Sequence, residues 1–516
     1  MPQKITSQIL IIDFGSQYTQ LIARRVRESG VYSIIKSNNI SYNELKEINP
    51  SGIILSGGPQ SVTRKTKISL DAKILKTGIP ILGICYGMQL IADKFKGKVN
   101  GSSKREFGNS QFNITHKSKL FNNIDPKKIN VWMSHSDKVV TLPKKFKTIG
   151  KSTNSKISAF ESKEYNIYGL QFHPEVTHTD FGREIIHNFL YIICGCKKLW
   201  TTKNIIKESI IEIREVVKNN NVILGLSGGV DSTVVAALLK KSIGKQLTCI
   251  FIDTGLMRKN ETQEVHDNIT KKLGIKLIVV NASAIFFNKL KGATDPEDKR
   301  KIIGETFIRV FEKESKKIKN VKFLAQGTIY PDVIESSNQG SKSEVIKSHH
   351  NVGGLPKNIN FELVEPIRNL FKDEVRKIGK SLKVPSSLIE RHPFPGPGLA
   401  VRILGEVTKK KVNILKEVDY IFIEELRNAK LYNKISQALA VFIPVKSVGV
   451  MGDKRKYDYV ISLRAVKTID FMTATVSDIP YELLNQISTR IINEVDGVAR
   501  VVYDITSKPP GTIEWE

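Results

Sequence analysis

Apolar residues along the chain gather in short runs, and each run ends in a turn of small or polar residues. In the first hundred positions such runs occupy residues 9–12, 53–55 and 79–84. Helical spacing of apolar residues follows the first run at 18–26 and the third at 88–95. Short apolar runs favour buried strands, and their alternation with helices is typical of a doubly wound, parallel α/β sheet.

The same alternation returns in the middle of the chain. An apolar run at 222–226 precedes a helical stretch that we expect to start near Thr233. Further strands are expected at 247–252, 277–280 and 321–325, and further helices at 205–217, 261–273 and 303–315. We therefore expect a second doubly wound parallel sheet, whose ligand would bind in the crevice at the carboxyl ends of the strands.

A Pro- and Gly-rich stretch at 391–398 separates these patterns from a different order of elements. Beyond it we expect a helix at 407–427, strands near 440–450 and 459–467, a helix at 481–494 and a strand at 498–505. This order indicates a smaller α+β domain. The expected domains are residues 1–197, 198–391 and 392–516, which suits a chain of 516 residues.

Composition narrows the class of protein. Apolar residues make up 40% of the chain, yet no apolar run approaches the roughly 18–20 residues of a membrane span. The opening residues, MPQKITSQ, lack the basic start and apolar stretch of a signal peptide. The four cysteines are Cys85, Cys194, Cys196 and Cys249, too few for a disulfide scaffold and typical of a reducing compartment. We therefore expect a cytoplasmic protein without a membrane partner.

The formal net charge of +29 first suggests nucleic acid as a partner. However, the lysines are scattered along the whole chain, and there is no basic tail, RNP motif or helix-turn-helix pattern. We therefore expect no dedicated nucleic-acid site. A small anionic substrate such as a nucleotide suits the positive charge better.

Residues 227–233, here called the phosphate loop, join the apolar run 222–226 to a helix. Backbone N–H groups of such a turn and the helix dipole both favour phosphate. No Walker lysine pattern is present, and the carboxylate of Asp231 would repel a bare phosphate, so we infer that Mg²⁺ lies between them. The alternative is an ordinary tight turn. The candidate ATP-binding residues are Ser227, Gly228, Gly229, Val230, Asp231, Ser232 and Thr233.

Residues 83–87, Gly-Ile-Cys-Tyr-Gly, have the form of a nucleophile elbow. A sharp turn between strand and helix exposes the central side chain, and the helix N-terminus favours a thiolate at Cys85. In Gln-Phe-His-Pro-Glu, an extended segment would place His173 and Glu175 on one face, so that Glu175 orients His173 as the base. Backbone N–H groups near Gly58 and of Tyr86 are candidates for an oxyanion hole.

Each of these residues also has a simpler interpretation. Taken alone, Cys85 could be a buried core thiol, which is common after an apolar strand, and His173 could be a packing histidine. The combination with the Ser-Gly-Gly-Pro turn at 56–59 favours a Cys/His/Glu catalytic triad. From the residues alone, this first domain is a cysteine hydrolase or transferase.

The segments GICYGMQ, SGGP and QFHPE resemble the class I, triad-type glutamine amidotransferase domain. The resemblance implies that Cys85 attacks the side-chain amide of glutamine, forms a glutamyl thioester and releases ammonia. It also implies that Gln89 and the backbone of Ser134 and His135 hold the glutamine.

The segment SGGVDS is similar to the signature of the N-type ATP pyrophosphatases. The resemblance implies that the phosphate loop holds the β,γ-pyrophosphate of ATP while a substrate oxygen attacks the α-phosphate. We expect Lys372 to add a cation to the phosphates, although it could be a solvated helix lysine. Asp332 is a second possible Mg²⁺ or substrate contact, or alternatively a helix cap. The polar segment 341–360 suggests a loop that closes over the nucleotide.

Together with PFPGPGLAVRILGE and KPPGTIEWE, these motifs resemble the family of glutamine-hydrolysing GMP synthases along essentially the whole chain. The resemblance implies that ATP adenylylates the C2 oxygen of xanthosine 5′-monophosphate (XMP), and that ammonia then displaces AMP. It implies XMP contacts at Arg300, Lys508, Ile513 and Glu514, and a homodimer formed through the third domain. The segment MGDKRKYDY at 451–459 departs from the family's usual MGDGRTYDY.

Two alternatives stay open at this point. One is another ATP-pyrophosphatase amidotransferase, such as a glutamine-dependent NAD synthetase that amidates a carboxylate of an NAD precursor. The other is a non-enzymatic protein that binds nucleotides or RNA, which the charge of +29 motivates. Turnover with XMP would separate the first from a GMP-forming enzyme, and salt-dependent RNA binding without turnover would support the second.

Overall fold

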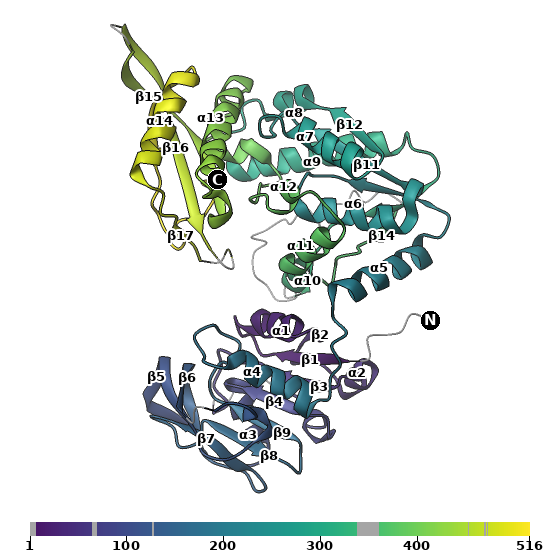
Figure 1. The fold of residues 1–516 in the computed structure, drawn as a ribbon, viewed down its shortest axis with the longest axis vertical. Helices are drawn as coiled ribbons and strands as arrows, with labels where there is room; N and C mark the ends of the chain where they lie inside the picture. Colours follow the sequence, from purple (N-terminus) through teal and green to yellow (C-terminus); the bar gives the residue numbers. More distant parts are fainter. Residues whose placement is uncertain are drawn as a thin grey trace. The chain divides into compact units, whose positions relative to one another are not determined.

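The computed structural model describes residues 7–63, 70–125, 128–337, 361–451, 454–468, 471 and 473–516. The chain divides into two compact units, residues 1–205 and 206–516 (Figure 1). The expected loop at 341–360 lies outside the described residues, as do Gly452 and Asp453 of the unusual MGDKRKYDY segment. Among the residues that the structure does describe, no helix is both long and apolar enough to cross a membrane.

The first unit is built on a nine-stranded sheet in the order β2-β1-β3-β4-β9-β8-β7-β5-β6. Its strands are β1 (Gln8–Asp13), β2 (Tyr32–Ser37), β3 (Gly52–Leu55), β4 (Ile81–Ile84), β5 (Lys98–Ile114), β6 (Lys128–Thr141), β7 (Lys147–Ser152), β8 (Ala159–Ser162) and β9 (Ile167–Leu170). Its helices are α1 (Thr19–Glu28), α2 (Tyr42–Ile48), α3 (Tyr86–Lys94) and α4 (Gly182–His187).

Five strands of this sheet, from β2 to β9, run parallel as the sequence predicts. Strands β5 to β8 are antiparallel and extend the sheet at one side, which the apolar pattern did not predict. The central parallel strands are buried on both faces: β3, β4 and β9 have every residue buried. Continuous burial explains why these strands show unbroken apolar runs.

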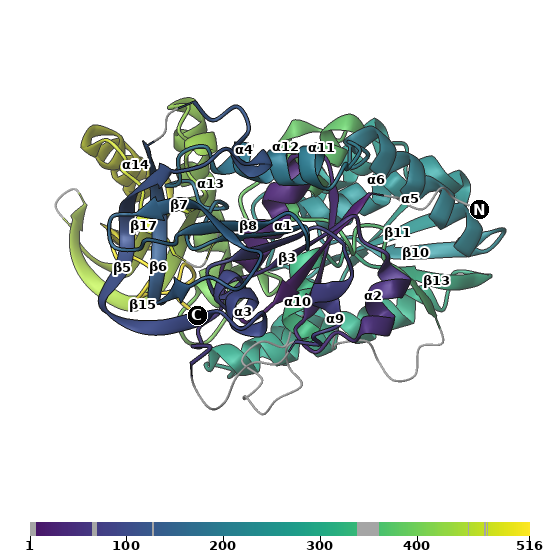
Figure 2. The same ribbon diagram turned by 90° about the horizontal axis from the view of Figure 1, so that it is seen from below.

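The second unit contains the expected second parallel sheet, in the order β12-β11-β10-β13-β14. Its strands are β10 (Asn221–Gly225), β11 (Leu247–Asp253), β12 (Leu277–Asn281), β13 (Val321–Ala325) and β14 (Glu362–Val364). Its helices are α5 (Thr202–Val217), in which the division between the units falls, α6 (Val230–Ile243), α7 (Glu261–Asp267), α8 (Ser283–Leu290), α9 (Pro296–Ser315), α10 (Tyr330–Ser337), α11 (Lys372–Ser381) and α12 (Ser386–Ile389). Figure 2 shows α5 and α6 along one face of β10, β11 and β13, with α9 along the other.

The strand order of this sheet reverses between β10 and β13, because the chain passes from β10 outward to β12 and then returns beside β10. Such a reversal opens a crevice at the carboxyl ends of the two strands. The loops that follow β10 and β13 therefore lie next to each other. A Cβ placed on Gly327, after β13, would lie 3.3 Å from the backbone nitrogen of Ser232 in the phosphate loop.

The C-terminal part of the second unit is the expected α+β arrangement. Its elements are α13 (Lys409–Asn428), β15 (Gln437–Met451), β16 (Lys454–Lys467), β17 (Thr475–Val476), α14 (Tyr481–Glu494) and β18 (Val498–Tyr503). Strand β16 pairs antiparallel with β15 and β17 and parallel with β18. The fold class of two doubly wound sheets and a smaller α+β part is therefore confirmed.

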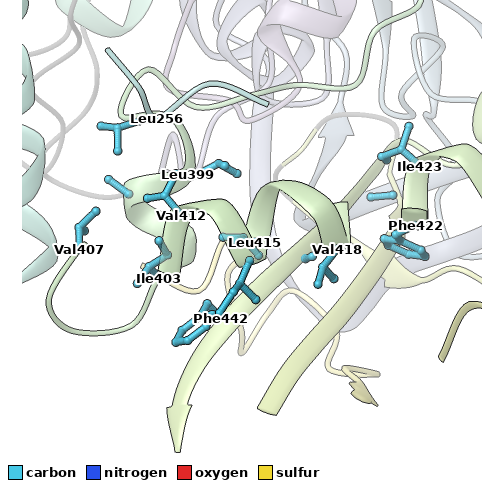
Figure 3. Packing of buried hydrophobic residues seen from close by; sticks show 14 of the residues in the cluster. Leu256, Leu399, Ile403, Val407, Val412, Leu415, Val418, Phe422, Ile423 and Phe442 are labelled. Atoms are coloured by element: carbon cyan, nitrogen blue, oxygen red, sulfur yellow. The ribbon is translucent and has the colours of Figure 1, made fainter. Parts of the chain in front are cut away.

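One apolar core runs through the whole second unit. It contains Ile223 and Ile250 of the parallel sheet as well as Phe442 and Ile461 of the antiparallel one. Figure 3 shows its centre, where Val412, Leu415, Val418 and Phe422 line one side of α13 and pack against Phe442 and the turn that carries Leu399. The continuity of this core makes the α/β and α+β parts of residues 206–516 one packed body.

Candidate active sites

The expected nucleophile elbow is present at the carboxyl end of β4. Cys85 is the N-cap of α3 and has φ 52° and ψ −105°, a conformation that ordinary residues rarely adopt. The turn closes tightly: a Cβ on Gly83 would lie 2.7 Å from the backbone of Gly87, and a Cβ on Gly87 would lie 2.4 Å from the carbonyl oxygen of Leu55. Glycine is therefore required at both positions to hold Cys85 at the helix N-terminus.

His173 and Glu175 follow β9 and form the expected pair. The distance from His173 Nδ1 to Glu175 Oε1 is 2.7 Å, and both side chains are buried. The segment is a series of bends rather than the extended stretch that we expected. Backbone contacts fix it instead, because Arg25 Nε donates to the Glu175 carbonyl at 2.9 Å and the His173 N–H donates to the Trp132 carbonyl at 3.0 Å.

The protonation of His173 is set by opposing effects. Burial disfavours the charged ring, but the Glu175 carboxylate and a hydrogen bond with Cys85 raise the pKa of His173 well above its ordinary value. The Glu175 carboxylate and the hydrogen bond with Cys85 therefore favour the protonated ring of His173. This is the state that can donate a proton to a leaving amine.

Replacing Glu175 with glutamine should lower the pKa of His173, because the carboxylate is the largest influence that raises it and burial then dominates. His173 then loses its proton as pH rises through a lower value than in the unaltered protein. A histidine ¹⁵N NMR titration, assigned with His173→Gln, measures this shift. We expect glutamine hydrolysis to fall by about 10²–10⁴-fold.

Glu164→Gln is the matched control for this variant, since Glu164 is an exposed partner of Lys145 in the same unit. It should leave both the His173 titration and the hydrolysis rate unchanged. An unaltered His173 titration in Glu175→Gln would show that the carboxylate does not control the base.

The two candidate oxyanion donors lie close together. Tyr86 is the first residue of α3, so its backbone N–H lies at the N-terminus of that helix. Gly58 follows β3, and a Cβ on it would lie 3.5 Å from a ring carbon of Tyr86 and 2.9 Å from the Phe14 carbonyl oxygen. The two loops therefore approach each other beside Cys85, as an oxyanion hole requires.

The remaining candidates for glutamine binding surround the thiol from α3 and β6. Cys85 Sγ lies 3.6 Å from the carbonyl oxygen of Ser134. The side-chain amide of Gln89 donates to the carbonyl of Asp137 at 2.8 Å. The neighbouring His135 is buried, with Nδ1 3.0 Å from the same carbonyl.

Three residues around the thiol were missed by sequence reasoning. Gln171 Nε2 lies 3.8 Å from Cys85 Sγ, and Gln171 Oε1 accepts a hydrogen bond from Gln89 Nε2 at 3.3 Å. Glu106 lies 3.1 Å from His135 Nε2, and Asp137 provides the carbonyl described above. Gln171 could have been found from the sequence, because it belongs to the motif that contains His173. Glu106 and Asp137 lie on strands that the apolar pattern did not predict.

The phosphate loop lies between β10 and α6, at the reversal of the second sheet. The helix begins at Val230, three residues earlier than expected, so Asp231, Ser232 and Thr233 belong to its first turn. Gly228 has φ 75°, which favours glycine, and Gly229 is the N-cap. The side chain of Ser227 stabilises the turn. Its Oγ accepts a hydrogen bond from the Gly229 N–H at 3.3 Å and lies 3.1 Å from Ser232 Oγ.

Asp231 contacts Lys372, the first residue of α11, through an ion pair between Lys372 Nζ and Asp231 Oδ2. The other carboxylate oxygen, Oδ1, is buried and has no hydrogen-bond partner among the residues that the structure describes. Among the described residues, no three His, Cys, Asp or Glu side chains are grouped so that they could hold a metal ion. One carboxylate with an unused oxygen fits Mg²⁺ that takes its other ligands from phosphates and water.

Asp332 has the capping role that was its simpler interpretation. Its Oδ2 accepts from the backbone N–H of Ile329 at 3.0 Å, at the start of α10.

The last ten residues, 507–516, here called the C-terminal tail, pack on the C-terminal sheet. Glu514 pairs with Arg402 through two hydrogen bonds of 3.0 and 2.8 Å. The Ile513 side chain is buried in an apolar cluster, while Lys508 donates from Nζ to the carbonyl of Phe471 at 2.7 Å. Arg300, on α9, donates to the backbone oxygen of Glu516 at 2.7 Å.

A hollow of about 510 Å³ lies between the C-terminal tail and strands β16 and β18. Arg464, Asp504 and Glu514 contribute charged groups to its wall. Of the four candidate XMP residues, Glu514 lines this hollow, whereas Arg300, Lys508 and Ile513 make the separate contacts described above.

Comparison with known families agrees with the order of the two sites. Residues 10–193 match the family described as glutamine amidotransferase class-I, residues 203–304 match NAD synthase, and residues 424–515 match the GMP synthase C terminal domain. An amidotransferase unit followed by an ATP-pyrophosphatase unit defines a glutamine-hydrolysing ligase.

Whole-length relatives identify the family within that class. The chain is 55% identical to "GMP synthase [glutamine-hydrolyzing]" of Teredinibacter turnerae, with 100% of each chain covered, and 57% identical to the protein of that name from Hahella chejuensis, with 99% of this chain and 98% of the relative covered. The chain belongs to the family of glutamine-hydrolysing GMP synthases. A solved structure of a glutamine amidotransferase from Thermotoga maritima is 19% identical and covers 42% of this chain and 86% of its own, with a TM-score of 0.29.

Proposed function

We propose that the protein converts XMP, ATP, L-glutamine and water into GMP, AMP, diphosphate and L-glutamate. The observation that carries this proposal is the identity of 55% to a glutamine-hydrolysing GMP synthase along the whole of both chains. The match of residues 424–515 to the GMP synthase C terminal domain also supports it. The NAD synthase match at 203–304 fits the ATP-pyrophosphatase part that both kinds of enzyme use.

In the first unit, Cys85 Sγ attacks the amide carbon of glutamine and His173 donates a proton to the leaving nitrogen. Ammonia leaves and a glutamyl thioester remains on Cys85. Water, deprotonated by His173, then attacks the thioester and releases glutamate. The contact of 2.7 Å between His173 and Glu175 supports this assignment, since Glu175 fixes the ring and stabilises its charge. N–H groups at Gly58 and Tyr86 would receive the developing oxyanion.

In the second unit, the C2 oxygen of XMP attacks the α-phosphorus of ATP, and diphosphate leaves from the phosphate loop. Ammonia then adds at C2 and AMP departs, which leaves an amino group at C2. The N-terminal turn of α6 supports the role of the loop, because its N–H groups face outward and favour a departing anion. Lys372, which contacts Asp231, would share the charge of the phosphates.

Mg²⁺ is the cofactor that this site would take. Asp231 would hold it through the carboxylate oxygen that is buried and has no hydrogen-bond partner among the described residues. When bound, the ion neutralises the negative charge that builds up on the leaving diphosphate. Asp231 and Lys372 then act as one unit, in which a carboxylate positions a cation and an ammonium group contacts the phosphates.

For XMP, we propose contacts with the C-terminal tail and α9. Arg300 and Lys508 carry positive charge that suits the 5′-phosphate. Ile513 has its side chain in the apolar cluster, so only its backbone would be available to a ligand. Glu514, whose carboxylate is 19% exposed and held by Arg402, would accept a hydrogen bond from the purine or ribose through the exposed part.

We also propose a homodimer formed by the C-terminal sheet. Val448, Val450 and Tyr457 are on one face of the β15–β16 hairpin and are 38, 74 and 60% exposed. Exposed apolar groups on a paired strand face are typical of an interface.

The double substitution Val448→Glu/Val450→Glu should convert a dimer into monomers, because it buries two charges in the apolar contact. Light scattering after gel filtration measures the mass. Ile285→Glu, at an exposed apolar residue on α8, should leave the dimer intact. A monomeric unaltered protein at micromolar concentration would contradict the proposal.

The assay that tests the proposed function supplies XMP, ATP and glutamine and identifies the products. We expect GMP, AMP, diphosphate and glutamate in equal amounts, and no turnover when a carboxylate precursor of NAD replaces XMP. Amidation of that precursor instead of XMP would overturn the proposal. RNA binding without turnover of either compound would point to the non-enzymatic alternative.

A further inference from the structure

A row of buried charges begins at the phosphate loop. Arg391 NH1 donates to the carbonyl oxygen of Gly228 at 3.2 Å. The same guanidinium pairs with Glu261, with 2.9 Å between Arg391 NH2 and Glu261 Oε1. The other oxygen of Glu261, which opens α7, accepts from the backbone N–H of Arg258 at 2.8 Å.

The row continues from Arg258 to the C-terminal tail. Arg258 Nε lies 3.3 Å from Asp419 Oδ2, and Asp419 Oδ1 lies 3.6 Å from Arg402 NH1. Arg402 in turn holds Glu514 with two hydrogen bonds. Three arginines thus alternate with three carboxylates between the phosphate loop and the tail; we call these six residues the ion-pair chain: Arg391, Glu261, Arg258, Asp419, Arg402 and Glu514.

Burial makes the members of the ion-pair chain depend on one another. The side chains of Arg402, Glu261 and Asp419 are only 0, 2 and 3% exposed. A charge at such a position is stable only beside its partner, so a displaced partner forces its neighbour to move or to lose its stabilisation. The guanidiniums of Arg258 and Arg402 both pack against the ring of Phe394, at 4.7 and 5.0 Å from its centroid.

The link at Asp419, on α13, is the loosest in the row. Its two contacts are longer than ordinary hydrogen bonds. Arg258 Nε and NH2, Arg402 NH1 and Asp419 Oδ1 are buried and have no hydrogen-bond partner among the described residues. Polar groups left in this state favour any movement that closes the gap. The ion-pair chain can therefore tighten at Asp419 when either end is displaced.

We propose that the ion-pair chain couples ATP binding at the phosphate loop to XMP binding at the C-terminal tail, with Asp419 as the positioning residue at its centre. This inference rests on the proposed function, which puts ATP at one end and XMP at the other. A nucleotide that shifts Gly228 displaces Arg391, and through Glu261 and Arg258 it changes the position of Asp419. Asp419 then alters how firmly Arg402 holds Glu514 against XMP. ATP thereby raises the affinity for XMP. By thermodynamic reciprocity, XMP raises the affinity for ATP by the same factor.

The test measures the Kd of XMP by calorimetry on the full chain, alone and with saturating α,β-methylene-ATP, an analogue that cannot transfer its adenylyl group to XMP. For the unaltered protein we expect XMP to bind about fivefold or more tightly with the analogue present. In Arg391→Met, which removes the first link, the Kd of XMP alone should stay unchanged while the ratio falls towards 1. In Asp419→Asn, which removes the central charge without changing shape, both the ratio and the Kd of XMP alone should change.

Glu305→Gln, at an exposed ion pair on α9, is the control for Asp419→Asn, whose charge change it shares, and should keep the ratio of the unaltered protein. A ratio near 1 in the unaltered protein overturns the coupling, and so does a full ratio in Arg391→Met. If Asp419→Asn does not fold, Arg391→Met still decides. Absence of GMP formation by the unaltered protein would instead overturn the proposed function, which keeps the two failures distinct.

Discussion

Replacing Cys85 with alanine should abolish GMP formation from glutamine and leave GMP formation from free ammonia unchanged. We expect the glutamine-dependent rate to fall by more than about 10³-fold, because without Sγ no thioester forms and the remaining groups act only on bound glutamine. Ammonia can reach the activated XMP without the first unit. The second unit has its own continuous core, so the substitution should not disturb it.

Both rates are measured in one preparation, with glutamine or an ammonium salt as the nitrogen source and each at a saturating concentration. Cys194→Ala is the matched control from the same unit, since burial raises the pKa of the Cys194 thiol well above its ordinary value and keeps it unreactive. It should retain both rates. Loss of the ammonia-dependent rate in Cys85→Ala would show that the two chemistries are not separate.

Local patterns predicted most elements of the fold. Strand β13 and helix α14 have the bounds expected from the sequence, 321–325 and 481–494. In these segments each residue's burial follows from its own neighbours along the chain, so that the apolar spacing suffices. Helix α6 began three residues early because glycine at the N-cap and Asp231 in the first turn are helix-start signals that apolar spacing alone does not register.

The antiparallel strands of the first unit show why a pattern can fail. Along β6 alternate residues are buried, as in any half-buried strand. Two of the inward positions, however, are His135 and Asp137, whose polar groups find partners inside the amidotransferase site. The functional side chains therefore interrupt the apolar alternation that would have revealed the strand.

Motifs located the parts of each site but not the contacts between distant segments. Cys85, His173 and Glu175 could be found because each belongs to a short motif with a mechanical reason for its spacing. The contact of Lys372 with Asp231 joins residues 141 positions apart, and Arg402 meets Glu514 across 112. Such pairs depend on how strands and helices pack, which no local signal encodes.

Among these long-range contacts, the pair of Asp231 and Lys372 leads to the second large effect. Asp231→Ala should abolish GMP formation from both glutamine and ammonia, by about 10²–10³-fold or more. The substitution removes the carboxylate that would hold Mg²⁺ and the partner that positions Lys372. The leaving diphosphate then lacks both sources of positive charge, so adenylylation of XMP stops before either nitrogen source is used.

The first unit gives an internal check on this result, because Cys85 in Asp231→Ala should still be alkylated by a glutamine analogue at the rate of the unaltered protein. Lys372→Met distinguishes the contribution of the lysine from that of Mg²⁺. It keeps the Asp231 carboxylate, so it should retain Mg²⁺-dependent activity at a reduced rate. Asp267→Asn, at an exposed carboxylate on α7 that pairs with Lys271, should leave both activities intact. Undiminished synthesis in Asp231→Ala would contradict the role of this carboxylate. Equal losses in Asp231→Ala and Lys372→Met would show that the Asp231–Lys372 ion pair, rather than Mg²⁺, carries the effect.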